Sequence, residues 1–287
     1  MRHPILILLC TGSALALAGC NQGPTTAEAA RAMKSVNVVD QSNMNDIMLT
    51  VADPGEAINY FINASAENPD RIDLQRGLAK SLVRGKRPAD GAAVLAQIVG
   101  GPEGTDADRV DYADALIRAN DWPGAKAALN TIPPTYETFD RYRLEAMVAD
   151  SEQNWKKADS FYETAIGLTT TPGNVLNNWG FSKLTRGDYA GAEKLFTQAI
   201  SYDPNLFTSK NNLVMARAAQ QKYDLPVVTM SQTERAQLLY TAALAAIKQG
   251  DVSVGKSLLR DAVETSPAFF EAAQRSLDAL EGTAAKG

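Results

Sequence analysis

The stretch VLNNWGFSKLTRGDYAGAEKLFTQAISYDP, residues 175–204, decides the fold. It contains two apolar segments separated by Gly187-Asp188, two residue types whose backbones suit a tight turn. Gly180 lies midway along the first segment, and two helices that cross closely need a small side chain where they meet. Pro204 ends the second segment, because proline cannot continue a helix. The stretch therefore predicts two helices joined by a tight turn.

The same pattern recurs along the chain at a spacing of about 34 residues. NWKKADSFYETAI at 154–166 aligns with DYAGAEKLFTQAI at 188–200, and the paired residues are all 34 apart. A helix pair of this kind cannot bury its apolar face alone, so neighbouring pairs must stack. Further copies are GEAINYFINASAENP (55–69), DWPGAKAALNTIPP (121–134) and GDVSVGKSLLRDAVETSP (250–267).

This pattern resembles the tetratricopeptide repeat (TPR), a helix–turn–helix unit of 34 residues. The residues that carry the resemblance are Gly180, Gly187, Asp188, Tyr189, Ala192, Phe196 and Pro204. It covers most of residues 55–281 and implies an all-α fold, a TPR-type α-solenoid with a C-terminal capping helix. It also implies that the first helix of each pair lines a concave surface where extended peptides bind.

The repeat frame places small residues at the helix crossings and aromatic residues between adjacent pairs. The expected small residues are Ala113, Ala146, Gly180 and Ala243, and the expected interlayer aromatics are Trp155, Tyr162, Tyr189 and Phe196. The expected helices are 44–51, 55–67, 71–84, 89–99, 106–119, 123–131, 136–151, 156–168, 174–186, 190–202, 206–221, 232–249, 253–264 and 268–281.

The period breaks at LPVVTMS, residues 225–231, where a second helix is due. Pro226 disfavours helix in the residue before it, and the β-branched residues that follow favour extended backbone. Ser231 followed by Glu234 is typical of a capping box that opens the next helix. Two interpretations of Leu225–Met230 remain open. It is either a structural linker packed along the solenoid, or a strap or partner contact in the groove.

The first twenty residues have the layout of a secretory leader. Arg2 and His3 precede an apolar run from Ile5 to Ala18 that is too short to span a membrane. The run ends in Leu-Ala-Gly-Cys at 17–20, which resembles the lipobox of bacterial lipoproteins. The resemblance implies a signal peptide over 1–19, cleavage before Cys20 and lipid attachment to its thiol. An ordinary leader with an accidental cysteine is the alternative.

The residues after Cys20 bear on its location. Asn21 follows the cysteine where aspartate would favour the inner membrane, so the resemblance implies lipid anchoring in the outer membrane, facing the periplasm. Residues 20–43 show little apolar periodicity and are expected to form a flexible tether. The TPR superhelical domain is expected over 44–284.

Composition argues against several classes of chemistry. Cleavage before Cys20 removes Cys10, the only other cysteine, and His3, the only histidine. The mature chain could then form no Ser-His-Asp triad, no catalytic Cys-His pair and no zinc site built on cysteine or histidine. The net charge of −5 without a basic block disfavours nucleic acid. The acidic stretch DADRVDYADALIR at 106–118 lacks the glycine of a calcium-binding EF-hand loop, so it is expected to start a helix. We expect no catalytic residue, no cofactor, no metal ion and no small-molecule substrate.

Asparagine pairs on two of the expected first helices form the candidate binding site. They recur 34 residues apart. An asparagine side chain can donate a hydrogen bond to a peptide carbonyl and accept one from a peptide N–H. Two basic residues nearby could bind a carboxylate or an acidic segment. The alternative is that the asparagines tie helix to helix. The candidate groove residues are Asn177, Asn178, Lys210, Asn211, Asn212 and Arg217.

A lipobox followed by degenerate TPRs resembles the TadD-type lipoproteins of Flp (Tad) pilus assembly. The match is best over about 139–221. It implies a non-enzymatic scaffold whose partners are pilus or secretin assembly proteins. The alternative is a TPR lipoprotein that recruits or regulates peptidoglycan hydrolases.

Overall fold

The computed structural model describes residues 44–282. The chain divides into two compact units, Met1–Asp53 and Pro54–Gly287. In the described part of the first unit, residues 44–50 form a helix. The predictions for the leader, Cys20 and the tether concern residues outside the described part. Among the helices that are described, none combines the length and apolar character needed to cross a membrane.

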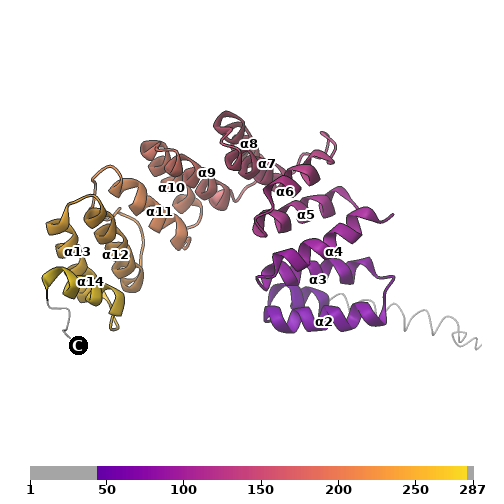
Figure 1. Ribbon diagram of the computed structural model, residues 1–287, viewed down its shortest axis with the longest axis horizontal. Helices are drawn as coiled ribbons and strands as arrows, with labels where there is room; N and C mark the ends of the chain where they lie inside the picture. Colours follow the sequence, from indigo (N-terminus) through magenta and orange to yellow (C-terminus); the bar gives the residue numbers. More distant parts are fainter. Residues whose placement is uncertain (1–43, 283–287) are drawn as a thin grey trace, which may run out of the picture. The chain divides into compact units, whose positions relative to one another are not determined.

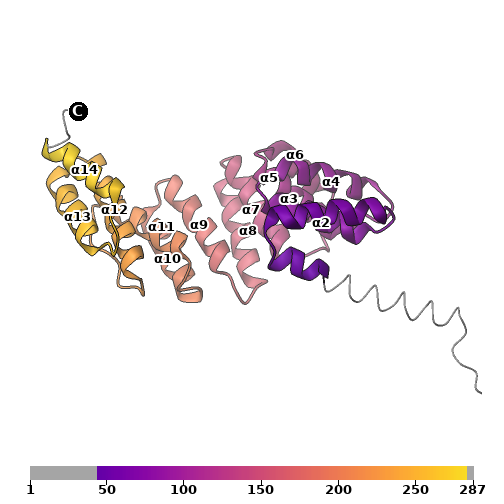
Figure 2. The ribbon, with the colours of Figure 1, turned by 90° about the horizontal axis from the view of Figure 1, so that it is seen from below.

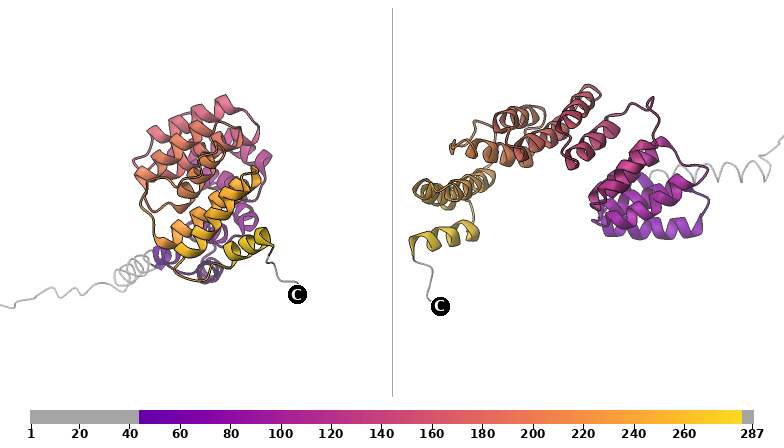
Figure 3. Two further views of the ribbon diagram at one scale, coloured as in Figure 1. Left: turned by 90° about the vertical axis from the view of Figure 1, so that its left-hand side faces the viewer. Right: turned by 45° about the horizontal axis from the view of Figure 1, so that its top comes forward.

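The second unit is built from helices alone over its described residues, and each helix packs on the next (Figure 1). Figures 2 and 3 follow the same succession from further directions. The helices are α2 (Pro54–Glu67), α3 (Ile72–Arg84), α4 (Pro88–Gly100), α5 (Asp106–Arg118), α6 (Trp122–Asn130), α7 (Phe139–Ser151), α8 (Trp155–Gly167), α9 (Gly173–Thr185), α10 (Tyr189–Tyr202), α11 (Phe207–Ala218), α12 (Gln232–Lys248), α13 (Val252–Thr265) and α14 (Glu271–Glu281).

The expected helices agree with these bounds within three residues. The largest differences, of three residues each, lie at the starts of α7 and α14 and at the end of α11, which stops at Ala218. α7 begins at Phe139 because Tyr136 closes a turn onto the Pro133 carbonyl and the Thr138 hydroxyl then caps the helix. α14 begins only after Phe270, whose ring packs against that of Tyr240.

The pair α9–α10 shows why the opening stretch folds as it does. A Cβ atom added to Gly180 would lie 2.7 Å from the ring of Phe196, so only glycine lets the two helices approach this closely. Phe196 is fully buried. Gly187 has φ of +85°, in the left-handed region that favours glycine, and Asp188 caps α10 by accepting from the Gly191 amide. The other crossing residues, Ala113, Ala146 and Ala243, are fully buried as well.

The chain has no helix between Ala218 and Gln232, where the sequence predicts an irregular segment. Leu225, Val228 and Met230 pack into hydrophobic clusters with residues of α10 to α14. Val214, the residue 34 positions after Gly180, is buried in one of these clusters. The larger side chain fits because no second helix crosses α11 there. The packing of the segment favours its interpretation as a structural linker.

A buried ion pair bridges the same break. Lys210 on α11 is only 2% exposed, and its Nζ lies 2.8 Å from Oε1 of Glu234 on α12. Glu234 also forms the expected capping box, since its Oε2 accepts from the Ser231 amide and the Ser231 hydroxyl accepts from the Glu234 amide. The hydrogen bond from Lys210 and that from the Ser231 amide lower the pKa of Glu234. The pair therefore fixes α12 against α11 where a helix is missing.

A second ion pair joins the repeats near the N-terminal end of the unit. Nε and Nη2 of Arg76 on α3 donate to the two carboxylate oxygens of Asp108 on α5, at 2.7 and 2.9 Å. The amide and hydroxyl of Thr105 also donate to Asp108, whose side chain is 3% exposed. Burial by itself raises the pKa of Asp108, but the hydrogen bonds from Arg76 and Thr105 outweigh it and lower that pKa to about 2.

We expect Asp108→Asn to lower the free energy of unfolding by about 2 kcal/mol at pH 7, since one pKa unit corresponds to about 1.4 kcal/mol. A lowered carboxyl pKa stabilises the fold above the unfolded value and loses this effect as pH falls to the folded value. The wild type should therefore lose its advantage over the variant between about pH 4 and pH 2. Urea denaturation of both proteins across this range measures it, and a difference that does not change with pH would contradict it.

Candidate functional site

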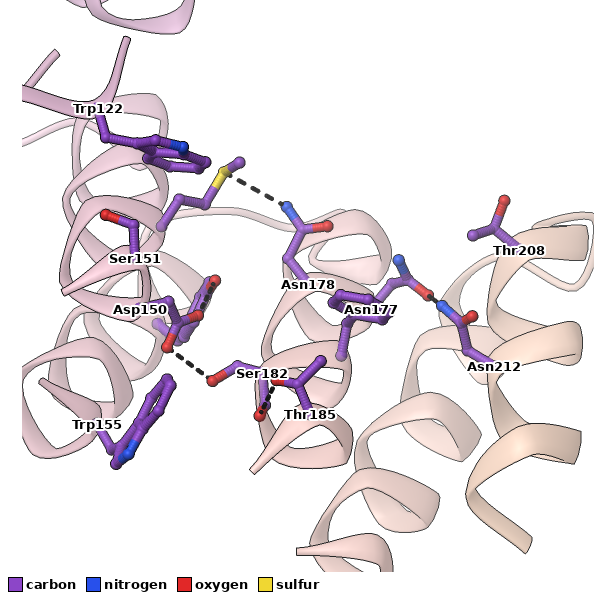
Figure 4. Close-up of a pocket in the computed structure, with 13 residues that line it drawn as sticks. Trp122, Asp150, Ser151, Trp155, Asn177, Asn178, Ser182, Thr185, Thr208 and Asn212 are labelled. Atoms are coloured by element: carbon purple, nitrogen blue, oxygen red, sulfur yellow. Dashed lines mark hydrogen bonds between the residues drawn. The ribbon is translucent and has the colours of Figure 1, made fainter. Parts of the chain in front are cut away.

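A pocket of about 510 Å³ opens between the first helices of three successive repeats, α7, α9 and α11, beside the starts of α6 and α8 (Figure 4). We call it the central pocket. Its lining residues are Trp122, Met147, Asp150, Ser151, Trp155, Tyr162, Asn177, Asn178, Phe181, Ser182, Thr185, Thr208 and Asn212. The repeat geometry makes this pocket, because equivalent faces of successive first helices lie next to one another. Met147 and Phe181, for example, are 34 residues apart.

A carboxylate lies in the pocket wall. Oδ1 of Asp150 accepts from the Ser182 hydroxyl at 2.7 Å, and Oδ2 accepts from the Tyr162 hydroxyl at 2.8 Å. These bonds tie α7 to α8 and α9. Burial raises the pKa of Asp150 and outweighs the opposing effect of the two hydrogen bonds. Burial, followed by the negative charge of Asp150, also raises the pKa of Tyr162 far above its ordinary value. Tyr162 is therefore a neutral hydrogen-bond donor.

Aromatic rings form much of the remaining wall. Trp122 and Trp155 stand at the first residues of α6 and α8, and both are partly exposed. Phe181 on α9 is 49% exposed although it is a large apolar residue. The expectation that Trp155 fills the layer between helix pairs holds only in part, because its position at a helix start leaves it at the pocket. Tyr162 and Phe196 are buried as expected, whereas Tyr189 is exposed.

Three of the predicted asparagines line the pocket, with different roles. The Asn212 amide donates to Oδ1 of Asn177 at 3.1 Å, and the Ser209 hydroxyl donates to the same oxygen at 3.0 Å. These two asparagines therefore tie α9 to α11. The Asn178 amide makes only a weak contact, with Sδ of Met147 at 3.8 Å. Of the three, Asn178 is therefore the asparagine whose amide makes no strong hydrogen bond within the described residues.

The other predicted groove residues do not line the pocket. Lys210 is buried in its pair with Glu234. Arg217 binds Glu193 at 2.8 Å and Asp224 at 2.7 Å. Oδ1 of Asn211 accepts from the Thr241 hydroxyl at 2.7 Å. All three residues connect neighbouring elements.

The sequence pattern does not predict that Asp150, Trp122 and Phe181 belong to the site. One signal was available for Phe181. Met215 lies 34 residues after it, and both are exposed apolar residues at one position of the repeat frame. Apolar residues that recur at a frame position outside the core leave apolar surface exposed on this face of the first helices.

Over residues 44–282, the side chains do not bring together three or more metal-ligating groups. Neither a protein-family profile nor any curated protein matches the chain in sequence.

Solved structures show what the fold is similar to. One is a chain in the crystal structure of the APC/C hetero-tetramer Cut9–Hcn1, with a TM-score of 0.58 and 13% identity, over 79% of this chain and 46% of that one. Another is a tetratricopeptide repeat protein from Parabacteroides merdae ATCC 43184, with a TM-score of 0.54 and 14% identity, over 87% of this chain and 96% of that one. The chain spans less than half the length of the first of these structures. These likenesses, with the helix pairs described above, confirm the predicted fold, a TPR-type α-solenoid.

Proposed function

We propose that the protein is a non-enzymatic scaffold that binds an extended segment of a partner protein across the central pocket. The observation that carries this proposal is the exposed Phe181 beside the Asn178 amide, on the helix at the middle of the pocket. An exposed aromatic ring supplies a contact that excludes water, and an adjacent amide can bond the peptide backbone. The pocket is also within the size range of protein ligand sites, roughly 300–1,000 Å³.

The finer part of the proposal concerns location and partner. A lipid on Cys20 would hold the scaffold in the outer membrane, facing the periplasm, and the partners would be pilus or secretin assembly proteins. The lipobox-like leader and the resemblance of residues 139–221 to TadD-type lipoproteins support this. An anchor raises the local concentration of the binding surface near membrane-bound partners, which strengthens binding without new contacts.

Site-specific photo-crosslinking tests the proposed function. The crosslinking residue p-benzoylphenylalanine replaces Phe181 in one variant and Tyr202 in the other. Tyr202 is 59% exposed and does not line the central pocket, so it is the matched control. We expect covalent adducts from position 181 that contain pilus or secretin subunits, and few from position 202. Adducts of equal yield from both positions would contradict binding at the pocket. Adducts with cell-wall hydrolases alone would contradict the pilus assignment.

The anchor has a separate test. We expect Cys20→Ser to lose fatty-acid labelling and to leave the membrane fraction, because the acylated thiol is then missing. Cys10→Ser, which alters the other cysteine of the leader, should keep both properties. Fractionation and lipid labelling of the two variants measure this. Normal labelling of Cys20→Ser would refute the anchor.

A further inference from the structure

The central pocket is lined by a negative charge and by no positive charge. Asp150 is the one residue with a formal charge among the thirteen that line it. Each of its oxygens already accepts one hydrogen bond, from Ser182 or from Tyr162. A carboxylate oxygen has two lone pairs, so Asp150 retains capacity for another donor.

The basic residues near the pocket are engaged with other acids. Nη2 of Arg186 lies 2.5 Å from Oδ1 of Asp159, and the charge of Arg186 also acts on Asp150, where it lowers the pKa. Nη2 of Arg143 lies 3.2 Å from Oδ1 of Asp114. Neither arginine lines the pocket. The pocket lining itself therefore supplies no cation to Asp150, and the surroundings screen its charge less than bulk water does.

The walls around Asp150 suit a cation with an aliphatic stem. In Figure 4, Asp150 lies between Trp122 and Trp155 on one side of the pocket. Tryptophan is the aromatic side chain with the strongest attraction for cations, and Trp155 already has the Arg186 guanidinium 5.6 Å from its ring centroid. Met147 and Phe181 supply apolar surface for methylene groups.

We propose that the central pocket accepts a lysine or arginine side chain of the bound polypeptide, with its cation at Asp150 and its stem against the aromatic wall. This inference rests on the proposed function, because it names the chemistry of the segment that the scaffold binds. The peptide backbone beside the basic residue then lies near the Asn178 amide.

Short peptides of known composition test the inference on the full chain. The probes are end-capped, fluorescently labelled heptapeptides, Gly-Ser-Ala-Xaa-Ala-Ser-Gly, in which Xaa is arginine, lysine, citrulline, norleucine or glutamate. Citrulline has the shape of arginine without its charge. We expect the arginine and lysine peptides to bind about tenfold more tightly than the citrulline, norleucine and glutamate peptides, measured by fluorescence anisotropy.

Variants that remove one negative charge test whether Asp150 causes the preference for a basic residue. Asp150→Asn should reduce the preference for arginine over citrulline to less than about threefold. Glu163→Gln removes the same charge from an exposed position outside the pocket and should leave the preference unchanged. Trp122→Leu provides a second test that leaves the Asp150 hydrogen bonds in place, and it should weaken the arginine peptide more than the norleucine peptide.

Three results would overturn the inference. They are equal binding of the arginine and citrulline peptides, tighter binding of norleucine, and a preference that survives Asp150→Asn. If photo-crosslinking from position 181 succeeds while the peptides show no preference, the proposed function stands and the basic-residue inference fails. If neither crosslinks nor peptide binding are found, both fail.

Discussion

Replacing Phe196 by alanine is expected to lower the free energy of unfolding by about 3–5 kcal/mol. The Phe196 ring is 0% exposed and lies against Gly180, where the two helices of a pair come closest. The truncation leaves a cavity that the glycine on the facing helix cannot fill. The α9–α10 pair contacts neighbours on both sides, so weakening it weakens the interfaces with α8 and α11 as well.

Phe181→Ala is the matched control, since the same atoms are removed from a neighbouring residue of the facing helix. Its side chain is exposed at the pocket, and we expect the free energy of unfolding to change by less than about 1 kcal/mol. Urea denaturation followed by circular dichroism compares the two variants. Repeat arrays can unfold in steps, so hydrogen exchange of the α9 and α10 amides should accompany it. Equal losses in the two variants would contradict the assigned packing.

The helix pairs can be predicted from the sequence because the residues that determine them act locally. Glycine and aspartate at the turn, a small residue at the crossing and a proline at the end all act within one helix pair. Gly180, Gly187 and Phe196 therefore have the expected roles. The predicted start of α7 is three residues too early, because the turn at Tyr136 depends on a hydrogen bond that the helical pattern does not encode.

The site was harder to predict because its residues converge from different repeats. Lys210 shows the difficulty. Its place on a first helix predicts a groove residue, but the missing second helix brings α12 against α11 and buries Lys210 on Glu234. Asp150 and Trp122 become site residues only through the stacking of successive pairs. The sequence shows that the asparagines are periodic. It does not show that Asn177 and Asn212 bond helix to helix whereas Asn178 is a candidate ligand contact.

The double variant Asn178→Ala/Phe181→Ala is expected to weaken partner binding about 100-fold, because buried aromatic anchors at the centre of an interface carry much of the binding energy. Stability should fall by less than about 1 kcal/mol, since Phe181 is exposed and Asn178 contacts only a methionine sulfur atom at 3.8 Å. The two readouts separate a binding role from a structural one.

The control for this variant is Gln198→Ala/Tyr202→Ala, which removes a polar and an aromatic side chain from an exposed surface outside the central pocket. Its affinity for the partner should match that of the wild type. A control that loses as much affinity as the pocket variant would place the binding surface elsewhere.

The central claim is that the faces of α7, α9 and α11 around the central pocket bind an extended polypeptide. The most direct measurement is the dissociation constant of a labelled partner segment, identified by crosslinking at position 181, for the wild type and both double variants. We predict that affinity falls about 100-fold in Asn178→Ala/Phe181→Ala and stays unchanged in the control variant. The unfolding transition of Asn178→Ala/Phe181→Ala should be preserved. An unchanged dissociation constant in that folded variant would contradict the claim.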